Sequence, residues 1–128
     1  MSGLITFSLA GRDYATPLAG VREVVRLRGL TDLPGLRPPM VGVLDVRGVV
    51  LPVLDLRVER TGTGDVLVLE RDGLVGVAVD RVQAVVTSLP AAGTASPHEL
   101  PAYVRDVLRG PAGTVFLVDL AEMVEAVR

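Results

Sequence analysis

Short runs of valine and leucine, broken by glycine, proline or pairs of charged residues, constrain the fold of this chain more than any motif does. The breaks recur about every eight to twelve residues, which is the spacing of short strands joined by turns. Valine is branched at Cβ and favours extended backbone over helix. The pattern therefore predicts an all-β fold, a sandwich or a barrel of many short strands.

The predicted strands follow these runs, and turn residues separate many of them. They are Leu4–Leu9, Tyr14–Leu18, Val21–Leu27, Val41–Val46, Val49–Leu56, Val66–Glu70, Leu74–Val79, Val82–Leu89, Tyr103–Leu108 and Thr114–Leu120. Turns are expected at Gly11–Arg12, Arg47–Gly48 and Asp72–Gly73, because glycine adopts the positive φ that tight turns need. Residues Pro90–Pro101 are predicted to form a loop, and Ala121–Val127 a short terminal helix.

The two halves of the chain resemble one another. The segment Leu18–Val25 (LAGVREVV) aligns with Val79–Val86 (VDRVQAVV), which places Val21 over Val82. Similarity at a spacing of about sixty residues predicts two pseudo-repeated barrel subdomains within a single domain that spans residues 1–128. A small barrel suits such a unit, because closure removes exposed strand edges. Chance alignment of a valine-rich sequence is the alternative.

Charge and aromatic content weigh against nucleic-acid binding. The thirteen basic residues, all arginine, are offset by fifteen acidic ones, which gives a net charge of −2. A protein that follows a phosphate backbone needs a basic face, and one that stacks bases needs exposed aromatic rings. Aromatic residues make up only 3% of the chain. A small barrel that binds nucleic acid is therefore a remote alternative.

The residue types that usually hold metals are scarce. The chain has no cysteine and a single histidine, His98, which is expected to be solvated in a loop. Thiolate sites and two-histidine metal sites are thereby excluded, and no cofactor is expected. The N-terminal residues lack the pattern of a signal peptide, and no apolar run reaches the roughly 18 residues of a membrane helix. We expect a cytoplasmic protein.

Two carboxylates are the first candidates for catalysis, since Asp45 and Asp55 lie on the arms of one predicted hairpin. General acid–base chemistry needs carboxyl groups close together with separated pKa values. No histidine, nucleophile or metal ligand accompanies these two. Both are therefore expected to be turn or strand-end residues that bond to backbone, and the protein is not expected to be an enzyme.

Arg47 stands alone at the tip of an otherwise apolar hairpin, in the segment LDVRGVVLPVLDL. An arginine keeps its charge, so at a turn it is either solvated or available to a carboxylate or carbonyl of a partner. Glu23 raises the same question within the apolar run GVREVVRL. It lies either on the solvent face of a strand or on the polar rim of a binding patch.

Four segments together resemble the CheW-like adaptor domains of bacterial chemotaxis. They are ITFSLAGRDYATPLAGVREVV, MVGVLDVRGVVLPVLDLR, VLVLERDGLVGVAVDRVQAVV and TVFLVDLAEMV, and they cover most of the chain in the order of the family. The second segment is the most specific. The resemblance implies two intertwined five-strand SH3-like barrels with a short C-terminal helix.

The same resemblance implies a non-catalytic scaffold that couples methyl-accepting chemoreceptors to a CheA-type histidine kinase. Such a protein is recruited to receptor arrays at the inner membrane without inserting into the membrane. The implied receptor-binding residues are Leu18, Val21, Glu23, Arg47, Val66 and Val82. The implied kinase-binding residues are Val24, Leu27 and Leu30. For each valine, a place in the barrel core is the alternative.

Two departures from the family pattern bear on these roles. Asp45 replaces the usual asparagine, and an ion pair between Asp45 and Arg47 is one way to keep the hairpin in shape. The connection from Arg57 to Val66 is shorter than in the family. The alternative function is therefore a truncated adaptor that binds only one of the two partners, in a chemosensory pathway that controls something other than swimming.

Overall fold

The computed structural model describes residues 3–60, 63–93 and 99–127. The elements in this part of the chain are β1 (Leu4–Leu9), β2 (Arg12–Pro17), the 3-10 turn η1 (Leu18–Gly20), β3 (Val21–Arg26), β4 (Met40–Val46), β5 (Val49–Asp55), β6 (Asp65–Glu70), β7 (Leu74–Val79), β8 (Arg81–Val86), β9 (Val104–Gly110), β10 (Gly113–Val118) and α1 (Leu120–Val127). No helix in it combines the length and the apolar character that crossing a bilayer requires.

Each predicted strand is present, and the differences lie at the ends. The first turn forms at Ala10–Gly11, with φ of 53° and 76°, rather than at Gly11–Arg12. Two successive positive φ values are the geometry of a tight hairpin whose twist matches its strands. Because the turn ends one residue earlier, β2 begins at Arg12 instead of Tyr14. The other large difference is β8, which ends at Val86.

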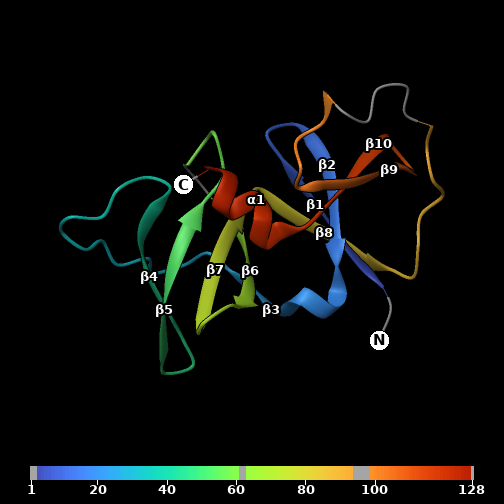
Figure 1. Ribbon diagram of the computed structural model, residues 1–128. Helices are drawn as coiled ribbons and strands as arrows, with labels where there is room; N and C mark the ends of the chain where they lie inside the picture. Colours follow the sequence, from blue (N-terminus) through green and yellow to red (C-terminus); the bar gives the residue numbers. More distant parts are fainter. Residues whose placement is uncertain (1–2, 61–62, 94–98, 128) are drawn as a thin grey trace.

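Two five-stranded sheets form the body of the molecule, and each takes strands from both halves of the chain (Figure 1). The first sheet has the order β8-β1-β2-β10-β9 and the second the order β3-β6-β7-β5-β4. If each strand from β1 to β5 is replaced by the strand numbered five higher, and each strand from β6 to β10 by the strand numbered five lower, the first order becomes the second. This symmetry is what duplication of a five-strand unit leads one to expect, and the duplication itself stays a prediction.

Isolated bridges close each sheet on itself. Just after β3, Thr31 bridges to Val43 of β4, with two backbone hydrogen bonds of 2.9 Å. After β8, Ala91 bridges to Leu108 of β9. These bridges join the segments that follow β3 and β8 to the strand at the opposite edge of the same sheet, which closes the barrel and covers strand edges. The result is two intertwined SH3-like barrels with a short C-terminal helix, as predicted; we name them barrel 1 (first sheet) and barrel 2 (second sheet).

Three apolar cores hold the barrels together. Barrel 2 encloses Leu44, Val46, Leu51, Val53, Val66, Val68 and Ala78. Barrel 1 encloses a smaller cluster of Ala15, Leu108 and Val115. The largest core, which we call the junction core, contains residues of both sheets and of α1: Ile5, Phe7, Leu9, Leu54, Leu67, Leu69, Val77, Val79, Val118, Leu120, Met123 and Val124. The two barrels therefore share the largest of the three cores.

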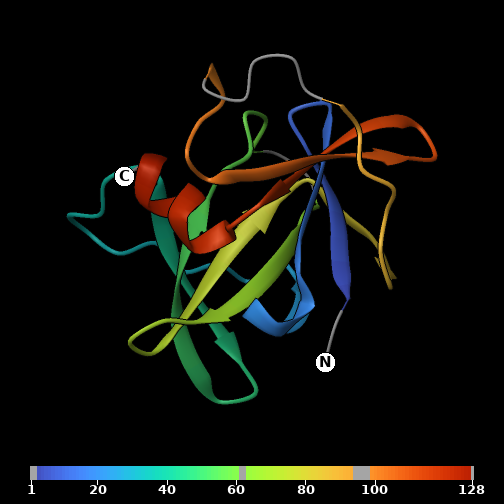
Figure 2. The same cartoon turned by 45° about the vertical axis from the view of Figure 1, so that its right-hand side comes forward.

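Helix α1 covers the junction core, and a polar cap starts it. The two views show α1 beside both sheets, while the connection between β3 and β4 projects from the body (Figures 1 and 2). The Asp119 carboxylate accepts a hydrogen bond of 3.0 Å from the backbone N–H of Glu122, which satisfies one of the helix's free donors. This cap fixes where the chain turns from β10 into the helix.

Candidate functional site

The turn between β4 and β5 presents Arg47 at its tip. Arg47 has a φ of 51° and Gly48 a φ of 85°, the paired positive values of a tight hairpin turn. The Asp45 carboxylate accepts a hydrogen bond of 2.8 Å from the backbone N–H of Gly48. Asp45 is therefore a turn residue that bonds to backbone, as predicted, and it holds the hairpin in shape without an amide group.

Arg47 pairs with Glu23 of β3. Its Nη2 lies 2.6 Å from each of the two carboxylate oxygens of Glu23. Hydrogen bonding to Glu23, reinforced by the charge of Glu23, raises the pKa of Arg47 above its usual value. The expected pair between Asp45 and Arg47 is wrong, because the Asp45 carboxylate is held within its own turn.

The pair bridges the two outer strands of barrel 2 at its open end. A register shift between Val21 and Glu23 sets Glu23 opposite Val68, on the face that lines barrel 2. The side chain of Arg47 is 72% exposed and that of Glu23 28%. Among the described residues, Arg47 bonds only through Nη2, so Nε and Nη1 remain available. A partner's carbonyl or carboxylate can therefore bind the guanidinium while the pair stays formed.

Three of the predicted receptor-binding residues line the junction between the barrels. Leu18 of η1, Val21 of β3 and Val82 of β8 are half-buried, and all pack against the junction core. The backbone N–H of Val82 also donates a hydrogen bond of 2.8 Å to the Asp65 carboxylate at the start of β6. Apolar side chains from η1, β3 and β8 therefore lie together at the junction, although β8 is far from the other two elements in sequence.

Val66 does not belong to this surface, so its predicted role in direct receptor contact needs correction. It is 0% exposed and lies in the core of barrel 2. Strand β6 is buried on both faces: Val66 and Val68 face barrel 2, while Leu67 and Leu69 face the junction core. A strand of this kind carries no alternation of polar and apolar residues, so its sequence does not mark which residues reach the surface.

The predicted kinase-binding residues do not share one face. Val24 is 41% exposed and lies opposite Leu67, so it points toward the junction side of the sheet. Leu27 and Leu30 are half-buried and pack against the core of barrel 2. The structure therefore separates Val24 from the two leucines.

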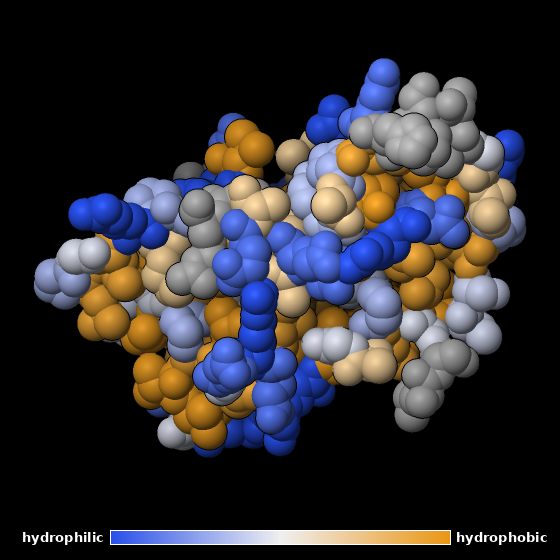
Figure 3. Space-filling model, in the orientation of Figure 1, coloured by the Kyte–Doolittle hydropathy of each residue, from blue (hydrophilic) through white to orange (hydrophobic). Residues whose placement is uncertain are grey.

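Exposed apolar residues also occur at positions that the sequence does not single out. Val49 and Val50 are 50% and 61% exposed next to Arg47, and Figure 3 shows apolar surface at the tip of this hairpin. Leu33 and Leu36 are exposed on the connection between β3 and β4, and Val85 is exposed on β8. The proline- and glycine-rich sequence around Leu33 and Leu36 is the signal that could have placed them outside a core.

A buried ion pair joins Asp55, at the end of β5, to Arg57. Arg57 Nε lies 3.0 Å from Asp55 Oδ1, Nη2 lies 2.9 Å from Oδ2, and the backbone N–H of Arg57 donates to the same carboxylate. Hydrogen bonding to Asp55 raises the pKa of Arg57. The sequence predicts that Asp55 bonds to backbone, and its carboxylate does accept from the backbone N–H of Arg57. The same carboxylate also accepts two hydrogen bonds from the guanidinium of Arg57, a residue that the sequence does not single out.

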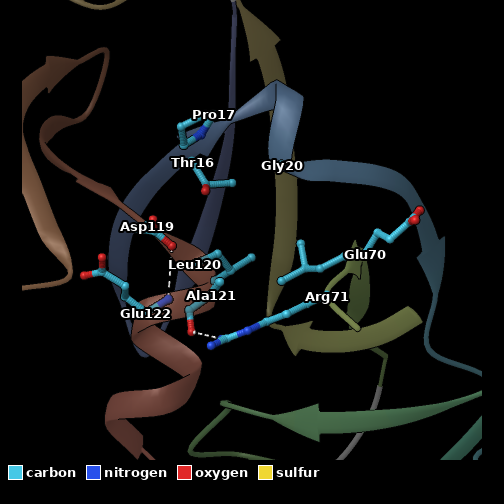
Figure 4. A pocket seen from close by; sticks show the side chains of 10 residues that line it. Thr16, Pro17, Gly20, Glu70, Arg71, Asp119, Leu120, Ala121 and Glu122 are labelled. Atoms are coloured by element: carbon cyan, nitrogen blue, oxygen red, sulfur yellow. Dashed lines mark hydrogen bonds between the residues drawn. The ribbon is translucent and has the colours of Figure 1, made fainter. Parts of the chain in front are cut away.

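A pocket of about 510 Å³ lies where α1 begins, between the ends of β2 and β6 (Figure 4). Its charged groups are engaged in structural bonds: Arg71 Nη1 donates to the carbonyl oxygen of Ala121 at 2.9 Å, and Asp119 caps α1. No nucleophile stands beside a base among the lining residues described. Within residues 3–60, 63–93 and 99–127, no three potential metal ligands gather. His98 lies outside the described residues.

Comparisons with known proteins agree with this architecture. The chain is 35% identical to the chemotaxis protein CheW of Bacillus subtilis over 92 residues, which cover 66% of this chain and 59% of that protein. It is 40% identical to the protein PilI of Pseudomonas aeruginosa over 52 residues, which cover 41% of this chain and 29% of that protein. The chain thus spans less than two thirds of the length of these relatives.

The chain also matches a solved structure and a family profile. The crystal structure of the scaffolding protein TtCheW from Thermoanaerobacter tengcongensis superposes with a TM-score of 0.72 at 21% identity, covering 93% of this chain and 84% of that chain. This likeness shows the shared fold. The profile of the CheW-like domain matches residues 3–128. On this match, which spans both barrels and α1, the chain belongs to the CheW-like domain family.

Proposed function

We propose that this protein is a non-catalytic adaptor that couples methyl-accepting chemoreceptors to a CheA-type histidine kinase. The observation that carries the proposal is the Glu23–Arg47 pair, which holds an exposed guanidinium on β3, two residues along the strand from Val21 of the junction, in a CheW-like domain. Strands of both halves of the chain position this surface. Neither a catalytic group nor a cofactor has a part in the proposed function.

Receptor contact follows from the chemistry of the junction. The tip of a receptor is proposed to lay an apolar helical face against Leu18, Val21 and Val82, which anchor it by burying apolar surface. Arg47 fixes the position of the helix by donating hydrogen bonds to carbonyl or carboxylate oxygens at the tip. Glu23 holds the guanidinium of Arg47 in place before the receptor binds.

Kinase contact is proposed to involve Val24, Leu27 and Leu30, the positions that the family resemblance supplies; Val24 is exposed and the two leucines are half-buried. Small interfaces of this kind bind weakly one at a time. Repetition across an array raises the effective concentration of each contact and gives stable assembly. The protein would act in the cytoplasm and be recruited to receptor arrays at the inner membrane.

A second candidate is an adaptor that binds the receptor alone, in a pathway other than swimming. The separation of Val24 from Leu27 and Leu30 favours it, because the two leucines pack against the barrel 2 core instead of forming an open patch with Val24. Under this alternative the receptor surface at the junction is unchanged.

The test is a pull-down from lysate of the source cells with the unaltered protein, the Arg47→Ala variant and the matched Arg109→Ala control. Arg109 is an exposed arginine on β9, far from the β4–β5 turn in sequence. Recovery of a chemoreceptor and a CheA-like kinase, with the receptor lost only in Arg47→Ala, supports the proposal. Receptor without kinase supports the second candidate, and recovery of neither overturns both.

A further inference from the structure

Matched irregularities in two strands shape the surface over the junction core. In β3 the register shifts between Val21 and Glu23, so that Val21 and Val24 both pair with residues of this core. In β8 a register shift likewise lets Val82 and Val85 both pair with residues of this core. Opposed side chains on neighbouring strands point to the same face of a sheet. All four valines therefore face the junction, including Val24, which the family resemblance assigns to the kinase.

Strands β3 and β8 run in opposite directions along this surface, and Gly3 lies where the start of β3 meets the end of β8. The carbonyl oxygen of Gly3 accepts a hydrogen bond of 2.9 Å from the backbone N–H of Leu18, in the turn η1 that leads into β3. A Cβ atom on Gly3 would lie 3.4 Å from the carbonyl oxygen of Val86, the last residue of β8. These two strand ends therefore lie close together.

Asp65 links the other two strand ends. Its Oδ2 accepts a hydrogen bond of 2.8 Å from the backbone N–H of Val82, near the start of β8. Its Oδ1 lies 3.8 Å from Nε of Arg26, the last residue of β3. The two strands are therefore related by an approximate two-fold rotation, as the strand orders of the two sheets also indicate. We call the surface formed by Leu18 and the four valines the junction face.

An apolar helix meets nearly the same junction face in either of two opposite directions. Rotation about the two-fold axis exchanges Val21 with Val82 and Val24 with Val85, and the members of each pair are the same residue type. Burial of apolar surface is not directional, so it anchors a helix here without choosing which end lies where. The direction of the helix must therefore come from polar groups at the ends of the face.

The two ends of the junction face differ in charge. At the Asp65 end, the side chain of Arg26 is 62% exposed and that of Asp65 only 14%, and the Asp65 carboxylate already binds backbone. The charge that reaches solvent there is therefore mainly the guanidinium. At the Gly3 end, the residue that corresponds to Arg26 is Thr87, which is exposed and uncharged.

A charged pair near the Gly3 end does not offset this difference. Arg22 of β3 forms an ion pair with Glu70 of β6, and their side chains are 60% and 61% exposed. Two opposite charges that lie close together and are equally exposed largely cancel at a distance. Arg26 therefore makes the Asp65 end of the junction face the more positive one.

We propose that Arg26 sets the direction in which a receptor helix lies on the junction face, with the C-terminal end of the helix beside Arg26. The last carbonyl groups of a helix are unpaired and carry partial negative charge, which an arginine stabilises. This role rests on the proposed adaptor function, because the partner is the receptor tip. It differs from the role of Arg47, which holds the helix near barrel 2.

The experiment marks each end of the junction face with a single cysteine, since the chain has none of its own. Val24→Cys marks the Arg26 end and Val85→Cys the Thr87 end, because each label lies two residues before the residue that it marks. Each full-length protein carries a benzophenone cross-linker on its thiol and is irradiated with the chemoreceptor recovered in the pull-down. Peptide mass mapping then gives a direction ratio, the yield of cross-links in the C-terminal half of the receptor helix over that in the N-terminal half.

With Arg26 in place, the direction ratio should be about two to five for the Val24→Cys label and below one for the Val85→Cys label, as a charge beside a helix terminus would produce. Arg26→Thr should bring both ratios toward one. Adding Thr87→Arg, which moves the charge to the other end, should lower the first ratio further. Arg109→Thr is the matched control and should leave both ratios unchanged.

Direction ratios that stay the same in Arg26→Thr and in the double variant would overturn the role of Arg26 and leave the adaptor function intact. Absence of receptor cross-links from every protein, including those that retain Arg26, would overturn both. Arg26 and Thr87 are exposed, so neither substitution disturbs a core, and far-UV circular dichroism checks the fold before irradiation.

Discussion

At the scale of the residue, two arginines with the same chemistry have different roles because their surroundings differ. Arg47 lies in solvent, where water competes with Glu23, so the pair orients the guanidinium more than it stabilises the fold. Arg57 is buried against Asp55, where either charge alone would be costly. Their substitutions should therefore separate binding from stability.

Arg47→Ala should reduce receptor capture without changing the free energy of unfolding measurably, because an exposed pair contributes little to folding. Urea unfolding followed by far-UV circular dichroism checks the stability, and the pull-down checks the binding. Glu23→Gln serves as the companion variant, since it keeps a hydrogen-bond acceptor but removes the charge. A large drop in the urea midpoint of Arg47→Ala would mean that the pair is structural.

Arg57→Met should destabilise the protein by about 3–5 kcal/mol, because it leaves the Asp55 carboxylate buried without its partner. Adding Asp55→Leu to this variant should restore part of the loss, since no charge then remains unpaired. Both values come from urea unfolding at neutral pH. A double variant less stable than Arg57→Met alone would contradict this account of the pair.

At the scale of the element, the β4–β5 hairpin and α1 each depend on one carboxylate that accepts from backbone. Asp45 accepts from Gly48 in the hairpin turn, and Asp119 accepts from Glu122 at the start of α1. In both places the chain changes direction, and the side chain supplies the acceptor that the local backbone lacks. Asparagine offers the same acceptor geometry, and alanine offers none.

Asp45→Asn should leave the protein as stable as the original, while Asp45→Ala should lose about 0.5–1.5 kcal/mol, the contribution of one ordinary hydrogen bond. The comparison uses thermal and urea unfolding of the three proteins side by side. A clear loss in Asp45→Asn would show that the carboxylate charge itself, rather than the acceptor, holds the turn.

Asp119→Ala should cost about 1 kcal/mol through loss of the helix cap, and Asp119→Asn should cost little. Hydrogen exchange of the α1 amides, with those of β6 as an internal reference, localises the effect. Faster exchange confined to α1 fits the cap. Equal acceleration in β6 would instead point to damage in the junction core.

At the scale of the whole molecule, strands of both halves build each sheet, and the two barrels share one large core. The junction core contains residues of both sheets and of α1, so neither barrel can open without exposing it. Leu67 of β6, in barrel 2, and Phe7 of β1, in barrel 1, are both 0% exposed within this core. A defect in one barrel should therefore weaken both.

Leu67→Ala should lower the free energy of unfolding by about 2–5 kcal/mol, the usual cost of a large-to-small change in a packed core. The fluorescence of the two tyrosines, Tyr14 of β2 and Tyr103 directly before β9, and the far-UV circular dichroism of the whole chain should shift together. Both tyrosines lie at strands of barrel 1, and the chain has no tryptophan to mask their emission. Two separate transitions would show that the barrels unfold independently.

Much of the fold could be predicted from local sequence. Valine-rich runs, glycine turns at Arg47–Gly48 and Asp72–Gly73, and the family segments located the strands and the barrel class, and their ends shifted by only a few residues. The candidate site was predicted less completely. Val66 was placed on a surface, yet it is buried, because β6 has apolar residues on both faces and its sequence carries no alternation to read.

Local sequence sets where strands and turns form, because side-chain shape and glycine's backbone freedom act on neighbouring residues. Three features arise only when the barrels close: the pairing of strands across the halves, the bond of Arg47 to Glu23 rather than Asp45, and the joint burial of Asp55 and Arg57. These outcomes depend on segments brought together by closure of the barrels. Burial and ion pairing are properties of that three-dimensional neighbourhood, which no local pattern records.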